Sequence, residues 1–63
     1  MKLNQRREQM GLTQQQLARK TGVSRVSISR YESGQREPTL TIAAKLAAAL
    51  GCTIEDLVEK KEE

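Results

Sequence analysis

The sequence contains no histidine, one cysteine, one proline and one aromatic residue, Tyr31, among its 63 residues. Without histidine, a Ser-His-Asp or Cys-His catalytic site is excluded, and so is a zinc site with imidazole ligands. A glycine-rich phosphate-binding loop is also missing from the sequence. We therefore expect no enzyme, no metal or other cofactor and no small-molecule substrate.

Cys52 stands alone, so an internal disulfide is impossible, which fits a reducing cytoplasm. It follows Gly51 in an apolar context, where we expect a small packed side chain. No run approaches the roughly 20 apolar residues that span a bilayer, and no apolar signal-peptide segment is present. These features predict a cytoplasmic protein without a membrane partner.

A domain of this length buries only about 60% of the surface that its unfolded chain exposes. That is too little to enclose a deep substrate cavity, so a function carried by the surface is favoured. Residues 1–38 hold eight basic and three acidic residues, whereas residues 39–63 hold three basic and five acidic ones. A basic half and an acidic half suit a domain that turns one face to a polyanion.

Apolar periodicity and capping residues predict an all-α fold of five short helices. Strand signals are missing, because apolar and polar residues do not alternate and no Asn-Gly or Asp-Gly turn occurs. The expected helices cover residues 2–10, 13–21, 25–33, 40–50 and 54–59, and residues 60–63 form a frayed end of the single domain 1–63.

Polar caps and glycines set the boundaries of these helices. Thr13 is followed by Gln16, and Thr53 by Asp56, at the spacing of a capping box. The third and fourth helices begin after the hydroxyl residues Ser24 and Thr39. The first four helices end before glycines, which are Gly11, Gly22, Gly34 and Gly51. Pro38 bars helix at the residue before it, which leaves residues 35–38 as a loop.

The expected core is aliphatic, because the chain has only one aromatic side chain. Its members lie at helical spacing or next to helix ends: Leu3, Met10, Leu12, Leu17, Ala18, Val23, Ile28, Tyr31, Ala43, Leu46, Ala47, Leu50, Ile54 and Leu57. Side chains of these types are more often packed than functional.

The second and third expected helices form the pattern of a helix-turn-helix unit. Ala18 is small, so the third helix can cross the second at a steep angle, and Gly22 allows a positive φ in the turn between them. Val23, Ile28 and Tyr31 are spaced to hold the third helix against the rest of the fold. Two short helices joined by a short turn with glycine make up this unit.

With these features the chain resembles the Cro/C1-type helix-turn-helix family, or XRE family, which includes lambdoid phage repressors and Cro. The similarity lies in the stretches GLTQQQLARKTGVSRVSISRYESGQREPTL and AAALGCTIEDL, and it covers most of the chain between Arg7 and Leu57. It implies a lambda-repressor-like domain of prokaryotic or phage origin. It also implies a sequence-specific transcriptional regulator of double-stranded DNA, expected to be a repressor.

In such a unit the third helix lies in the major groove, with its first residues at the base edges. The residues that we expect to contact bases are Arg25, Val26, Ser27 and Arg30. Arginines suit bidentate bonds to guanine O6 and N7, valine suits a thymine methyl group, and serine donates a hydrogen bond. The alternatives are arginines that are only solvated and a valine that is partly buried.

We expect contacts to the DNA backbone from Thr13, Gln14, Ser29, Gln35 and Arg36. The start of the second helix offers free N–H groups and the positive end of its dipole to a phosphate, although Thr13 could serve only as a cap. By the resemblance, Gln14 packs against the start of the third helix, and Gln35 and Arg36 form a second phosphate contact.

The resemblance further implies an ion pair between Arg7 and Glu32, which would tie the first helix to the end of the third. Members of the Cro/C1-type family commonly bind palindromic operators as two-fold dimers, with half-sites about 34 Å or a multiple of that apart. We therefore expect a homodimer, at least on DNA, with Ile54, Leu57 and Val58 as candidate contacts.

A different class of function stays open at this point. The chain could be a protein-interaction module, such as an antitoxin or an accessory protein that uses the helix-turn-helix body to bind another protein. That alternative predicts that the surface with Arg25 and Arg30 is dispensable.

Overall fold

The computed structural model describes residues 1–57, which form helices and no strand. The elements are α1 (Leu3–Gln9), α2 (Gln14–Thr21), α3 (Arg25–Ser33), α4 (Leu40–Ala49) and α5 (Ile54–Leu57). The all-α class is confirmed, and the expected helix ends agree with the structure to within one residue in this segment. The end of the expected helix 54–59 and the frayed residues 60–63 lie outside the described residues.

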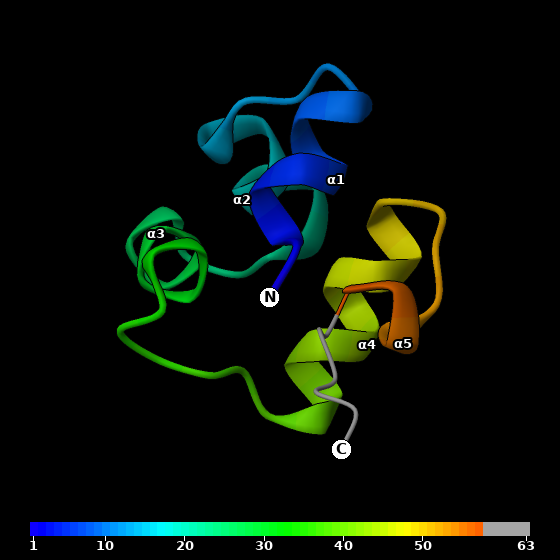
Figure 1. The fold of residues 1–63 in the computed structure, drawn as a ribbon. Helices are drawn as coiled ribbons and strands as arrows, with labels where there is room; N and C mark the ends of the chain where they lie inside the picture. The colour runs from blue at the N-terminus through cyan, green and yellow to red at the C-terminus, as the bar shows by residue number, and fades with distance from the viewer. Residues whose placement is uncertain (58–63) are drawn as a thin grey trace.

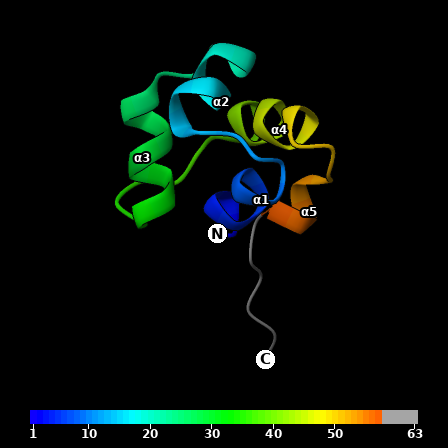
Figure 2. The same ribbon diagram turned by 90° about the horizontal axis from the view of Figure 1, so that it is seen from above.

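The five helices are arranged around one core. α3 lies at one side of the molecule and α4 and α5 at the other, with α1 and α2 between them (Figures 1 and 2). α2 packs against both α3 and α4, while α1 contacts α3 and α5 packs on α4. The Lys2 N–H donates to the Leu57 carbonyl at 2.8 Å, so the two ends of the described chain meet.

The predicted caps are present in the structure. The Gln16 N–H donates to Thr13 Oγ1 at 3.0 Å, and the Thr13 N–H donates back to Gln16 Oε1 at 2.8 Å. The same exchange joins Thr53 and Asp56, at 3.1 and 3.2 Å. The backbone N–H and the hydroxyl of Thr53 hold the pKa of the Asp56 carboxyl below its ordinary value.

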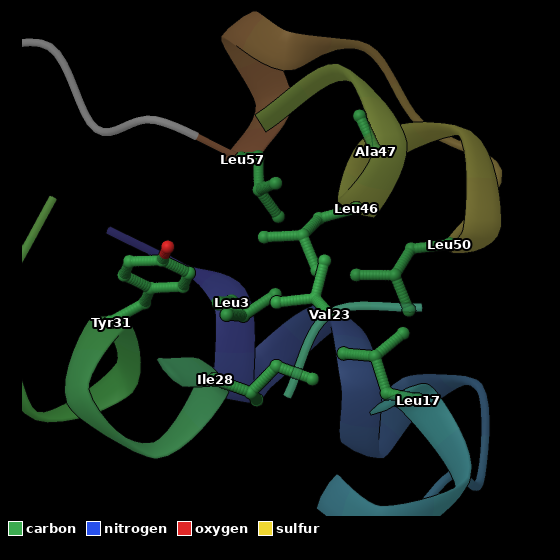
Figure 3. Packing of buried hydrophobic residues seen from close by; sticks show 9 residues of the cluster. All are labelled: Leu3, Leu17, Val23, Ile28, Tyr31, Leu46, Ala47, Leu50 and Leu57. Atoms are coloured by element: carbon green, nitrogen blue, oxygen red, sulfur yellow. The ribbon is translucent and has the colours of Figure 1, made fainter. Parts of the chain in front are cut away.

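The core is aliphatic apart from one tyrosine, as expected (Figure 3). Its buried members come from every helix, from the turn before α3 and from the cap of α4: Leu3, Leu17, Val23, Ile28, Tyr31, Ala43, Leu46, Ala47, Leu50 and Leu57. Partly buried side chains pack against it: Met1, Leu12, Ala18, Ile42, Ala49, Cys52 and Ile54. The packed position that we expected for Cys52 is therefore confirmed.

Met10 was predicted to belong to the core, and this prediction is wrong, because its side chain is 51% exposed. α1 ends at Gln9, and Met10 is the cap residue that leads into the turn at Gly11. Its side chain therefore does not continue the apolar face of α1 on which Leu3 is buried.

Candidate nucleic-acid interface

The turn between α2 and α3 is closed by contacts of its own residues. Gly22 has φ +79°, a left-handed conformation that residues with a side chain rarely adopt. The Val23 N–H donates to Thr21 Oγ1 at 3.1 Å, and the Thr21 hydroxyl donates to the Leu17 carbonyl at 2.8 Å. Because Val23 is buried in the core, the turn is anchored and fixes where α3 begins.

The first turn of α3 is held by a pair of serines. Ser24 Oγ accepts the Ser27 N–H at 3.1 Å, which caps the helix. The Ser24 hydroxyl donates to Ser27 Oγ at 2.9 Å. Since Ser27 Oγ accepts this bond, its own proton can be donated to a group outside the protein.

α3 divides into a buried and an outward face. Ile28 and Tyr31 are buried, one turn apart, and bind the helix to the core. Of the residues predicted to contact bases, Arg25, Val26 and Arg30 are exposed and Ser27 is partly buried. Val26 is 51% exposed and belongs to the exposed apolar residues, whereas the alternative was a partly buried valine.

The exposed arginines of α3 and of the segment after it form no ion pair with the described residues. Within residues 1–57, no carboxylate lies within ion-pair distance of Arg25, Arg30 or Arg36. Their positive charges are therefore not neutralised by the part of the fold that is described. Such a face attracts an anion such as a nucleic-acid backbone.

The residues predicted to contact a DNA backbone lie at helix ends, with one exception. Thr13 caps α2, and Gln14 is the first residue of that helix. Gln35 and Arg36 are exposed in the segment after α3, where the Gln35 N–H donates to the Arg30 carbonyl at 3.0 Å. Ser29, the exception, lies within α3 and is partly buried.

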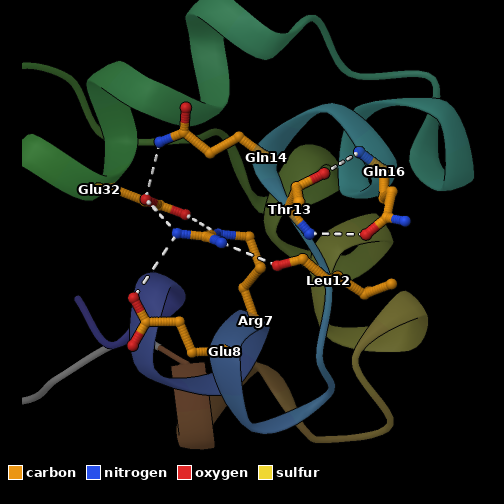
Figure 4. A network of polar contacts seen from close by, with 7 residues as sticks. All are labelled: Arg7, Glu8, Leu12, Thr13, Gln14, Gln16 and Glu32. Atoms are coloured by element: carbon orange, nitrogen blue, oxygen red, sulfur yellow. Dashed lines mark hydrogen bonds and ion pairs between the residues drawn. The ribbon is translucent and has the colours of Figure 1, made fainter.

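Arg7 and Glu32 are brought together between α1 and α3 (Figure 4). Arg7 Nε donates to Glu32 Oε2 at 2.7 Å, and Nη2 donates to Oε1 at 3.2 Å. The third nitrogen, Nη1, donates to the Leu12 carbonyl at 2.8 Å. The side chains of Arg7 and Glu32 are only 13% and 9% exposed, and the bond to Glu32 raises the pKa of Arg7.

Gln14 joins this cluster through a contact that the sequence did not predict. Its side-chain nitrogen donates to Glu32 Oε1 at 3.0 Å, so it is bonded to the last turn of α3 (Figure 4). Glu32 thereby accepts bonds from two helices. Sequence reasoning missed this contact, because residues 14 and 32 share no local spacing rule.

The residues expected at a dimer interface differ in their accessibility. Leu57 is fully buried in the core of the single chain, so its prediction as a contact with a second copy is wrong. The chain needs this leucine to cover its own core, and no surface of it is left. Ile54 is partly buried against the core, and Val58 lies outside the described residues.

Residues 1–57 contain no group of three histidine, cysteine, aspartate or glutamate side chains placed to hold a metal ion. In the same segment, each helix is too short or too polar to cross a membrane.

Comparison with known proteins gives one family. The helix-turn-helix family model matches residues 3–57. An uncharacterised HTH-type transcriptional regulator of Methanocaldococcus jannaschii is 45% identical over 56 residues, which are 89% of this chain and 85% of the relative. One from Methanothermobacter thermautotrophicus is 41% identical over 49 residues, 78% of this chain and 71% of the relative. The HTH-type transcriptional activator BcrR of Enterococcus faecalis is 38% identical over 61 residues, 97% of this chain but 30% of the relative. No solved structure matches significantly.

Proposed function

The chain belongs to the helix-turn-helix family, as its resemblance to Cro/C1-type regulators predicts, and we propose that it is a sequence-specific transcriptional regulator of double-stranded DNA. The observation that carries this proposal is the outward face of α3, where Arg25 and Arg30 are exposed and form no ion pair within residues 1–57. α3 enters the major groove, and its first turn meets the base edges.

The side chains of this face form different kinds of contact with the bases, according to their chemistry. Arg25 and Arg30 each donate two hydrogen bonds to guanine O6 and N7. Ser27 donates its free hydroxyl proton to a base acceptor or a phosphate, since its oxygen is already bonded by Ser24. Each bidentate contact is worth about 1–3 kcal/mol of discrimination against the wrong base pair.

Phosphate contacts fix the register of α3 in the groove. The start of α2, with Thr13 and Gln14, supports one phosphate through its N–H groups and helix dipole. Gln35 and Arg36 bind a second phosphate beyond the end of α3, and Ser29 reaches the backbone alongside.

A single α3 reads only a few base pairs, so the working form is a homodimer on a palindromic operator in the cytoplasm. Two copies place two recognition helices in successive major grooves, about 34 Å or a multiple of that apart. Of the predicted contacts, Ile54 keeps some exposed surface for this role. Occupying an operator is enough to hinder transcription, which makes repression the proposed role.

Binding-site selection from random duplexes tests the proposal. Wild type should enrich a palindromic sequence, and its affinity should fall steeply with salt. The double variant Arg25→Ala/Arg30→Ala should lose at least about 30-fold in affinity for that sequence, from two contacts of about 1 kcal/mol or more each.

The matched control removes the same charge elsewhere. Arg19 and Lys20 are exposed at the end of α2, and Arg19→Ala/Lys20→Ala should weaken binding to all duplexes alike while the preferred sequence stays the same. No enriched sequence, or an Arg25→Ala/Arg30→Ala variant that keeps full preference, would contradict DNA recognition by α3. That result would favour the protein-interaction module.

A further inference from the structure

Val26 is the one large apolar side chain of α3 that is exposed, at 51% of its surface. The other large apolar residues of the helix, Ile28 and Tyr31, are buried and hold it to the core. Val26 lies in the first turn, next to Arg25 and one turn before Arg30, which share the outward face. An apolar group therefore stands between two cations on the surface that is proposed to meet bases.

The chemistry of the major groove limits what such a side chain can recognise. The base edges offer hydrogen-bond donors and acceptors, which valine cannot use, and one apolar group, the C5-methyl of thymine. 5-Methylcytosine carries the same methyl group on the same ring carbon. A valine contact responds to this methyl group and takes no hydrogen bond from the neighbouring 4-position, which is a carbonyl in thymine and an amine in cytosine.

We propose that Val26 makes operator affinity depend on a C5-methyl group of one pyrimidine in each half-site, whether the base is thymine or 5-methylcytosine. This inference rests on the proposed function, because it needs α3 to lie in the major groove. Its consequence is regulatory: methylation of a cytosine at this position tightens binding, so the protein senses the modification state of its own site.

The expected effect is about fourfold in affinity for each methyl group. This factor corresponds to about 0.8 kcal/mol for burying one methyl group, at about 1.4 kcal/mol per tenfold change. It is smaller than the effect of an arginine contact, so it adjusts occupancy and influences the choice of sequence less than the arginines do.

The experiment uses the full chain and duplexes that carry the selected sequence. Each pyrimidine of a half-site is replaced in turn by thymine, uracil, cytosine and 5-methylcytosine, paired with the matching purine, and affinity is measured by fluorescence anisotropy. At one position, uracil should bind about fourfold more weakly than thymine, and cytosine about fourfold more weakly than 5-methylcytosine. If the thymine-to-uracil ratio equals the 5-methylcytosine-to-cytosine ratio, the protein responds to the methyl group and not to the group at the 4-position.

Two variants assign the effect to its residue. Val26→Ala should reduce both ratios toward one at that position, because the shortened side chain no longer reaches the methyl group. Leu40→Ala is the matched control, since Leu40 is also an exposed apolar residue but lies on α4, and it should keep both ratios. Any influence of the methyl group on DNA shape is common to all three proteins and cancels in the comparison.

Two results would overturn the inference. In the first, wild type and Val26→Ala show the same methyl ratios at every position. In the second, wild type binds the selected sequence but its affinity does not respond to the methyl group at any position. In both cases the proposed function stands without the methyl contact. If no sequence is selected at all, the proposed function and this inference fall together.

Discussion

Arg7 lies in the cluster that ties α1 to α3, and the variant Arg7→Met measures what this tie contributes to folding (Figure 4). Methionine keeps an apolar stem of similar length but has no donor. The Glu32 carboxylate would keep only the Gln14 amide as a partner, and the Leu12 carbonyl would lose the donor that Arg7 Nη1 supplies. An anion that is 9% exposed would then be left without a cation.

The magnitude follows from the burial of the pair. Breaking a buried ion pair by removing one partner costs about 3–5 kcal/mol, because the remaining charge is uncompensated. Both side chains keep about a tenth of their surface in water, so we expect a somewhat smaller loss, about 2–4 kcal/mol. A chain of this length has a total stability of about 3–9 kcal/mol. The loss is therefore a large part of the whole and should lower Tm by at least about 8 °C.

Thermal and urea unfolding, followed by circular dichroism, measure this change. Arg6→Met is the matched control, because the ion pair of the neighbouring Arg6 is long and exposed. Arg6 Nη2 lies 3.9 Å from Asp56 Oδ1, and both side chains are well exposed. Exposed pairs of this kind contribute little, so its Tm should stay near that of wild type. The double variant Arg7→Met/Glu32→Gln should regain part of the loss, because the unpaired carboxylate is gone. The reasoning is refuted if Arg7→Met and Arg6→Met unfold at the same temperature.

Two further variants test the turn and a cap. Gly22→Ala should cost about 1–2 kcal/mol from backbone strain alone, because φ is +79° while a Cβ there would meet nothing within 4 Å; thermal unfolding checks this, and an unchanged Tm contradicts it. The pKa of Asp56 is lowered by the N–H of Thr53, so its contribution to stability is present above the ordinary aspartate pKa and is lost as the pH falls through the folded value. The difference in Tm between wild type and Asp56→Asn should therefore shrink from about pH 6 to about pH 2, whereas a constant difference would speak against this origin.

The helix boundaries could be predicted because their causes are local. A cap joins residues three apart, as between Thr13 and Gln16, and a glycine ends a helix through its own φ. The outward position of Val26 also followed from spacing, because it lies off the apolar stripe of Ile28 and Tyr31. These features need no knowledge of how the helices are placed relative to one another.

The misplaced residues depend on how the helices pack. Met10 has the helical spacing of a core residue, but α1 ends one residue earlier and its side chain points to water. Leu57 is an apolar residue near the chain end, a pattern that fits a dimer contact and a core position equally well. The packing of α5 on α4 shows that Leu57 is buried in the core of its own chain.

The contact between Gln14 and Glu32 has a consequence that the sequence pattern alone does not predict. Glu32 accepts bonds from Gln14 at the start of α2 and from Arg7 in α1, while it stands in the last turn of α3. The start of α2 and the end of α3 are therefore linked across the cluster, in addition to the short turn that joins the two helices. If α2 binds a phosphate while α3 reads bases, the spacing between these two contacts is already set in the free protein. Less ordering is then required on binding, and less of the interaction energy is lost to it.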